Sequence, residues 1–176
     1  SEDWKQVSEN YLNTLIKSGF HMDSIPFQIR EQAQELIYTP QKRARPEKTC
    51  FQYVRDEISY TNYEFSLHAL IPEPAQEVNR KKSGDCKDNA ILIYQLLHAI
   101  GMKANLCLVS LEHSGYPNQP SIHQFNHMIV HVPGKKDDLD LFLDPTEKFQ
   151  PFRSVTLPLQ GKNAFILSNT NPRIVT

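Results

Sequence analysis

In the first third of the chain, apolar residues recur every three or four positions, which is the spacing of amphipathic helices. The pattern predicts one helix that ends at Gly19, a second over residues 27–38, and a third that begins at Pro46. Cys50 lies on the apolar face of the third helix, where a free cysteine packs as a small hydrophobe. Residues 60–80 show a weaker pattern, interrupted by prolines, which predicts a loop.

A longer apolar run follows, from about Cys86 to Ile100, and its apolar residues cover most of a helix's circumference. We expect this run to form the central buried helix, which Gly101 ends. Residues 104–110 then alternate as a strand does, and Cys107 within them is expected to be structural. Because the helical patterns come first and the strand patterns later, the chain is expected to be an α+β protein.

Two further alternating segments, residues 127–132 and 139–144, are separated by a turn sequence rich in glycine, lysine and aspartate. They predict a β-hairpin. If the two residues next to the turn face each other, His127 lies directly opposite Asp144, close enough for an imidazole–carboxylate hydrogen bond. A slip of one residue would put the two side chains on opposite faces of the sheet, so this register is a specific prediction.

Cys86 stands at the expected start of the central helix, immediately after a Gly-Asp pair. A helix N-terminus has unpaired N–H groups and a partial positive charge, both of which favour a thiolate. Lys81, Lys82 and Lys87 lie close in the sequence and are expected to add to this effect. Cys86 is therefore a candidate nucleophile; the alternative is a partly exposed small residue at a helix start.

A carboxylate that accepts a hydrogen bond from one histidine nitrogen orients the other nitrogen towards a nucleophile. Cys86, His127 and Asp144 could therefore form a complete catalytic triad. His123 and His127 also have the i, i+4 spacing of two metal ligands on a helix, but the sequence between them leads into a strand, which separates them. We expect no metal site, and the acidic residues near 137–140 are expected to solvate the hairpin tip, since they lack a calcium-loop pattern.

Composition removes several classes of function. With 19 basic and 20 acidic side chains, the chain offers no concentrated positive field, so no nucleic-acid partner is expected. No apolar stretch approaches twenty residues, so no membrane span is expected. Three cysteines without C-x-x-C spacing speak against a disulfide scaffold and against a zinc knuckle. A length of 176 residues suits one domain, and because the sequence opens with Ser1 rather than Met, we expect it to be excised from a longer protein.

Three blocks, "GDCKDNAILIYQLLHAIGMKANLCLV", "QFNHMIVHV" and "FLDPTEKF", together resemble the transglutaminase-like superfamily. The particular resemblance is to core domains of larger bacterial envelope proteins. It implies a papain-like fold, with N-terminal helices and a central buried helix packed against an antiparallel β-sheet. The domain would cover 1–176, with a helical part over 1–58, the nucleophile helix over 84–101 and the sheet over 104–167.

Transferred to this sequence, the resemblance implies Cys86 as the nucleophile, His127 as general base and then acid, and Asp144 as the residue that orients His127. The backbone N–H of Cys86 would form part of an oxyanion hole. Animal transglutaminases supply a second donor from an upstream tryptophan, but Trp4 falls in the first predicted helix. Tyr60 is the candidate substitute. No cofactor and no metal are implied.

The expected reaction is acyl transfer through a thioester, on a protein or peptide substrate. Hydrolysis would make the protein a protease or amidase, and attack by an amine would make it a cross-linking transglutaminase. Two other possibilities remain: a non-catalytic interaction module with the same fold, and a redox-sensing thiol with Cys107 as its resolving partner. The compartment is not encoded in the residues; the resemblance alone suggests the bacterial cell envelope or periplasm.

Overall fold

The computed structural model describes residues 3–20, 22, 24–61, 71–136 and 138–176. Its described α-helices are α1 (Trp4–Lys17), α2 (Phe27–Leu36), α3 (Pro40–Ala44), α4 (Pro46–Glu57), α5 (Ala75–Lys81) and α6 (Cys86–Ala99). Its described strands are β1 (Ser59–Tyr60), β2 (Ser83–Gly84), β3 (Asn105–Val109), β4 (His127–Val132), β5 (Leu141–Leu143), β6 (Ala164–Ile166) and β7 (Arg173–Val175). Short 3₁₀ turns lie at Ile122–Gln124 and Leu157–Leu159.

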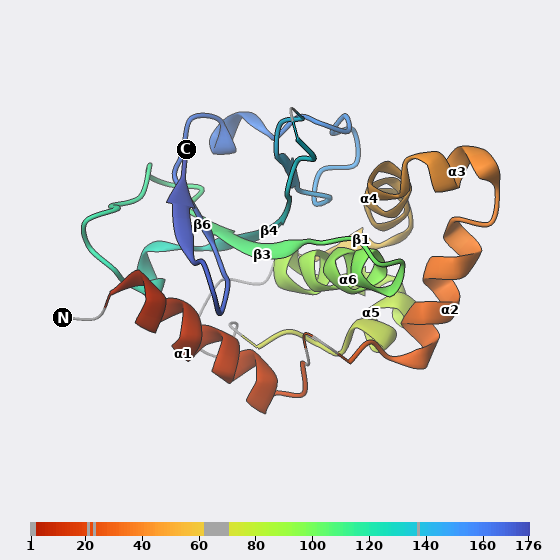
Figure 1. Ribbon diagram of the computed structural model, residues 1–176, viewed down its shortest axis with the longest axis horizontal. Helices are drawn as coiled ribbons and strands as arrows, with labels where there is room; N and C mark the ends of the chain where they lie inside the picture. Colours follow the sequence, from red (N-terminus) through yellow and green to blue (C-terminus); the bar gives the residue numbers. More distant parts are fainter. Residues whose placement is uncertain (1–2, 21, 23, 62–70, 137) are drawn as a thin grey trace.

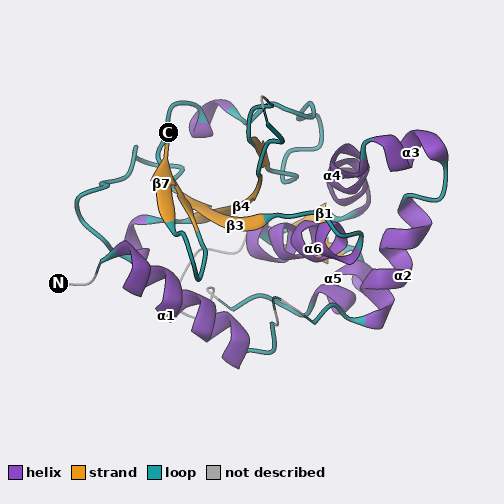
Figure 2. Cartoon of the chain, viewed as in Figure 1, coloured by secondary structure: helices purple, strands orange, loops and turns teal. Residues whose placement is uncertain are grey.

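Five strands form an antiparallel sheet in the order β5-β4-β3-β6-β7, and β1 and β2 form a separate parallel pair. The helix α6 lies against one face of the larger sheet, and α2, α4 and α5 surround its other sides (Figure 1). The helix α1 lies along the same face, nearer to β6 (Figure 2). The predicted fold class, α+β with a buried helix against an antiparallel sheet, is confirmed.

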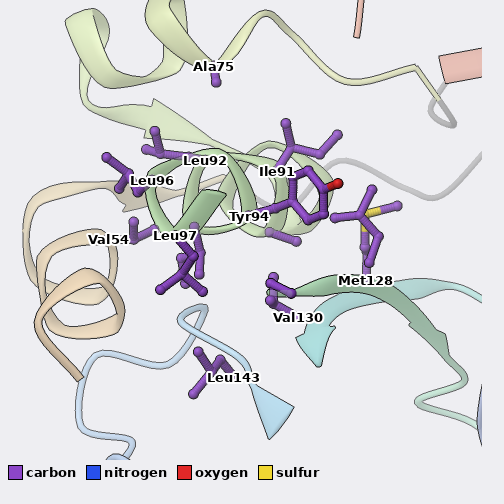
Figure 3. Packing of buried hydrophobic residues seen from close by; sticks show 14 of the residues in the cluster. Val54, Ala75, Ile91, Leu92, Tyr94, Leu96, Leu97, Met128, Val130 and Leu143 are labelled. Carbon is purple, nitrogen blue, oxygen red and sulfur yellow. The ribbon is translucent and has the colours of Figure 1, made fainter. Parts of the chain in front are cut away.

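The core is built around α6, because this helix is apolar on nearly every side. Leu92 and Leu96 are fully buried, as are most of their neighbours in the helix. Figure 3 shows α6 end-on, with Val54 of α4 to one side, Ala75 of α5 to another, and Val130 of β4 beneath it. Burial on all sides holds the N-terminus of α6 in a fixed position beside β4.

The opposite face of the sheet carries a second, smaller apolar cluster. Its buried members are Cys107, Val109, Ile129, Leu159, Ala164 and Ile166. Because side chains alternate along β3, Cys107 points away from α6 while its neighbours point towards it. Cys107 therefore packs in this smaller cluster, on the face of the sheet opposite α6, which is consistent with the structural role predicted for it.

The long helices lie within about two residues of their predicted bounds, and two short helices were not predicted. The first helix ends at Lys17 and Gly19 adopts a positive φ of 101°, while the helix that begins at Pro46 is α4. The helix predicted over 27–38 ends two residues earlier, at Leu36. We did not predict α3 or α5. Both are only one or two turns long, and too few of their residues are buried to produce a helical period.

The predicted register of the β4–β5 hairpin is wrong by two residues. Val132 pairs with Leu141, not with Leu139. The connection is longer than expected because Asp140 belongs to it, where its carboxylate accepts a hydrogen bond of 2.9 Å from the backbone N–H of Gly134. An even shift keeps every side chain on its predicted face of the sheet, so the faces were correct although the pairs were not.

Candidate active site

Cys86 is the first residue of α6 and is buried, with 6% of its surface exposed. The residue before it, Asp85, caps the helix by accepting hydrogen bonds from the backbone N–H groups of Lys87 and Asp88. The Asp88 side chain in turn accepts from the backbone N–H of Asp85 at 2.9 Å. This reciprocal capping box begins the helix at a defined residue and fixes the direction of the Cys86 side chain.

The Asp88 carboxylate also joins the start of α6 to neighbouring segments. Asp88 also accepts a hydrogen bond of 2.8 Å from the backbone N–H of Glu73. Gly84, in β2, fits here because a Cβ at this position would lie 2.7 Å from the Cβ of Asp88. The pairing of β2 with β1 then places Tyr60 beside Gly84. The hydrogen bond to Glu73, the close packing at Gly84 and the β1–β2 pairing therefore all restrain the backbone next to Cys86.

The lysines near Cys86 in the sequence each bind another side chain. Lys87 is buried and forms an ion pair with Asp85. The ammonium of Lys81 lies 2.6 Å from the carboxylate of Glu73, and that of Lys82 donates to a tyrosine hydroxyl. Cys86 is the first residue of α6, where the helix start carries a partial positive charge.

His127 and Asp144 form a buried pair beside β4 and β5. His127 Nε2 lies 2.8 Å from Asp144 Oδ2, and the two residues are only 3% and 1% exposed. The other carboxylate oxygen, Oδ1, accepts from the side-chain hydroxyl of Thr146 at 2.8 Å and from its backbone N–H at 3.2 Å. In the observed register Asp144 is a diagonal neighbour of His127, which a histidine still reaches.

The charges of this pair stabilise each other. Burial lowers the pKa of His127, but hydrogen bonds with Asp144 and with the Cys86 thiol outweigh it and raise the pKa to about 10. Burial raises the pKa of Asp144, but the hydrogen bond with His127 and its charge outweigh this and lower it. Since Nε2 is held by Asp144, Nδ1 is the nitrogen left for the thiol.

Tyr60, the candidate second oxyanion donor, lies close enough to Cys86 and Asp144 for their charges to act on its hydroxyl. Burial raises the pKa of its hydroxyl to about 12, and the negative charges of Cys86 and Asp144 contribute in the same direction. The phenol therefore stays protonated at neutral pH and keeps a hydrogen to donate. The Nε1–H of Trp4 donates to the backbone carbonyl of Pro117 and is therefore not directed at an oxyanion beside Cys86.

A groove of about 650 Å³ opens next to the His127–Asp144 pair. Its lining comes from β1, from the end of β3, from the segment after β5 and from the 3₁₀ turn near residue 157. The lining residues are Tyr60, Leu111, His127, Asp144, Thr146, Glu147, Phe149, Gln150, Thr156, Leu157 and Pro158. A polypeptide lying in this groove would pass directly beside the imidazole.

Comparison with known proteins gives one informative likeness. No family model and no curated protein matches the sequence. The structure of a "putative protease" from Parabacteroides distasonis aligns with 98% of this chain at a TM-score of 0.71 and 14% identity. The two proteins share a fold. This chain spans about a third of the Parabacteroides protein, 31% of its length. Legionella pneumophila LapG aligns with 78% of this chain and 81% of its own, at 20% identity and a TM-score of 0.42.

Sequence reasoning missed the approach of Tyr11 to the thiol and the capping role of Asp88. Tyr11 was assigned only to the apolar face of the first helix, yet the charges of Cys86 and Asp85 act on its buried hydroxyl, and burial first of all raises its pKa. No pattern signals that approach, because it depends on how α1 packs. Asp88 could have been found, since Asp85-x-x-Asp88 is a capping-box spacing.

Two negative observations hold for the described part of the chain. It contains no group of three or more histidine, cysteine, aspartate or glutamate side chains placed to bind a metal ion. Among the same residues, no helix is both long and apolar enough to span a bilayer.

Proposed function

We propose that this protein is a cysteine hydrolase that cleaves amide bonds in proteins or peptides, with Cys86, His127 and Asp144 as its catalytic triad. The observation that carries the proposal is the buried His127–Asp144 hydrogen bond of 2.8 Å, whose imidazole also bonds the thiol at the capped start of α6. The fold shared with the Parabacteroides protein supports a peptidase-type fold for this chain. The transglutaminase-like resemblance of the three sequence blocks supports the assignment of the triad.

In the proposed mechanism the Cys86 thiolate attacks the carbonyl carbon of the amide, and the C–O π electrons move to oxygen. The oxyanion would accept hydrogen bonds from the backbone N–H of Cys86 and from the Tyr60 hydroxyl. Collapse of this intermediate breaks the C–N bond as His127 Nδ1 donates its proton to the departing amine. Water then attacks the thioester while His127 takes its proton, which releases the carboxylic acid and regenerates the thiolate–imidazolium pair.

Hydrolysis is preferred to cross-linking because the groove beside the pair is open to water. Tyr60, at its edge, is 38% exposed, and Phe149 is 96% exposed. Water at high concentration would therefore compete with any amine for the thioester. A bacterial envelope location is a further proposal that rests on the sequence resemblance alone.

The test is alkylation by iodoacetamide from about pH 5 to pH 9, read for each cysteine by mass spectrometry, together with hydrolysis of a denatured protein substrate. Burial, reinforced by Glu47, raises the pKa of Cys50 to about 12, and burial also raises that of Cys107, so both are internal controls. We expect Cys86 alone to react, more than about tenfold more slowly after His127→Ala. Equal, slow labelling of all three thiols together with no hydrolysis would contradict the proposed hydrolase and favour a non-catalytic binding module.

The same experiment separates the proposal from a redox-sensing thiol. Such a sensor needs a resolving cysteine, and Cys107 lies in the cluster on the far face of the sheet. We therefore expect no Cys86–Cys107 disulfide after treatment with hydrogen peroxide. Its formation in the folded protein would favour the redox function.

A further inference from the structure

The groove beside His127 gathers exposed apolar side chains from separate parts of the chain. Leu111 follows β3, Phe149 follows β5, and Leu157 lies in the last 3₁₀ turn. They are 39%, 96% and 81% exposed. Single exposed hydrophobic residues are common on protein surfaces, but several that line one groove mark a binding site. Here that groove also contains two members of the proposed triad.

The described residues that line the groove carry charge of one sign. Apart from tyrosine and histidine, the ionisable residues among them are Asp144 and Glu147, and none of the described lining residues is a lysine or arginine. Asp144 is paired with His127, whereas Glu147 forms no ion pair with any described residue. Arg55, which donates to the backbone carbonyl of the lining residue Gln150, is paired with Asp56. Glu147 is thus available to a cation from outside the chain.

The size and position of the groove suit an extended polypeptide. A volume of about 650 Å³ falls within the range of pockets that bind ligands larger than one side chain. The apolar residues stand at the rim, and Glu147 lies close enough to Tyr60 for its charge to act on that hydroxyl. A bound segment would therefore meet apolar surface and a carboxylate within a short distance of the imidazole.

We propose that this groove is a specificity subsite, which selects polypeptide substrates that carry a large apolar side chain beside a lysine or arginine near the scissile bond. The apolar side chain packs against Leu111, Phe149 and Leu157, and the basic side chain pairs with Glu147. The inference rests on the proposed function, because it identifies the substrate class of the same site.

The experiment measures kcat/KM on four fluorogenic peptides that differ only at the two recognition positions: Leu-Lys, Ala-Lys, Leu-Glu and Ala-Glu. We expect Leu-Lys to be cleaved at least about tenfold faster than Ala-Lys, the discrimination that a hydrophobic pocket gives for a few methylene groups. We expect a smaller preference, about fivefold at most, for Leu-Lys over Leu-Glu, because the ion pair is exposed to solvent. A panel with the adjacent positions exchanged identifies their order.

Variants assign each preference to its side chain. Leu157→Ala and Phe149→Ala should reduce the Leu over Ala preference towards one, without changing the Lys over Glu preference. Glu147→Gln should abolish the Lys over Glu preference and Glu147→Lys should reverse it. Leu139→Ala is the matched control, since Leu139 is 88% exposed and lies in the β4–β5 connection, outside the groove lining.

Binding of the same labelled peptides to the Cys86→Ala variant, followed by fluorescence anisotropy, distinguishes the two proposals. Cleavage that requires Cys86 but differs less than about threefold among the four peptides would overturn the subsite and leave the hydrolase. Selective binding of Leu-Lys without cleavage by the unmodified protein would overturn the hydrolase and support the groove as a recognition site. Neither binding nor cleavage of any peptide would overturn both.

Discussion

At the scale of single residues, the chemistry depends on two opposing effects at His127. Burial disfavours the imidazolium, whereas the hydrogen bonds to Asp144 and Cys86 favour it, and the second effect prevails. Asp144 is held in place by Thr146, so the pair cannot separate without leaving polar groups unpaired. The charge state of the site is therefore set by contacts of a few side chains.

Asp144→Asn should lower the pKa of His127 from about 10 towards the ordinary value near 6.5, because the imidazolium loses its counter-ion. Activity should fall at least about 100-fold, since the ring loses its orientation. NMR titration of the histidine ring carbons measures the pKa. Asp140→Asn is the matched control: it removes the carboxylate charge 2.7 Å from Nε2 of His131, which lies on the same strand as His127, and should leave the pKa of His127 unchanged. An unchanged His127 pKa in Asp144→Asn would contradict this account.

The same pair predicts how stability depends on pH. His127 has a raised pKa in the folded state, so its contribution is fully present below about pH 6.5 and is lost as the pH rises towards about 10. Asp144 has a lowered pKa, so its contribution is present above about pH 4 and is lost as the pH falls through its folded value. Stability should therefore decline on both sides of a plateau.

Urea unfolding of the Cys86→Ala variant between pH 6 and pH 7.5 isolates the His127 effect, because no thiol at position 86 exchanges a proton with the imidazole and the other two thiols stay largely protonated in the unfolded chain. The unfolding free energy should fall by up to about 1.4 kcal/mol per pH unit. His127→Gln, which keeps a donor for Asp144 but does not titrate, should flatten this slope. Equal slopes for the two proteins would show that another group causes the decline.

At the scale of elements, several contacts constrain the start of α6. The capping box, the bond from Asp88 to the Glu73 backbone and the close approach at Gly84 all act on the same helical turn. The sequence contains each of these residues, and a capping-box spacing is readable from it. That they converge with β1 and α5 follows only from packing, since neither element shows a clear periodic pattern.

Gly84→Ala should displace the start of α6, because the added Cβ would lie 2.7 Å from the Asp88 Cβ and 3.1 Å from Val78 Cγ1. We expect a loss of about 1–3 kcal/mol in unfolding free energy and a several-fold slower alkylation of Cys86. Gly19→Ala is the control. Gly19 has a φ of 101°, and no atom of the described residues lies within 4 Å of an added Cβ, so we expect alanine there to cost stability through backbone strain. Equal effects of the two variants on Cys86 reactivity would argue against the proposed role of Gly84.

At the scale of the whole molecule, the first and last segments of the chain meet. Ser8 Oγ donates to the carbonyl of Ser168 and accepts from its backbone N–H, both at 3.0 Å. The Trp4 ring packs at a tilt against Phe125 and Phe165, with ring centroids 6.0 and 4.7 Å away. These contacts connect α1 to the sheet; that residues 1–176 form one domain stays a prediction.

Trp4 is the sole tryptophan, so its fluorescence reports the packing of α1 against the sheet. If 1–176 is one cooperative domain, unfolding by urea should give the same midpoint by tryptophan fluorescence and by far-UV circular dichroism. Phe165→Leu should shift both midpoints together. An earlier fluorescence transition, with the dichroism signal retained, would divide the chain into two units instead.

The sequence by itself determined the α+β class, the buried central helix and the side chains on each face of the β4–β5 hairpin. Periodicity is a local property, and it is strong where a helix or strand is deeply buried, as in α6. Only the tertiary structure decided the hairpin register, the partners of the three lysines, and the closeness of Tyr11 and Tyr60 to Cys86. These depend on loop length and on contacts between distant segments, whose energies no local pattern contains.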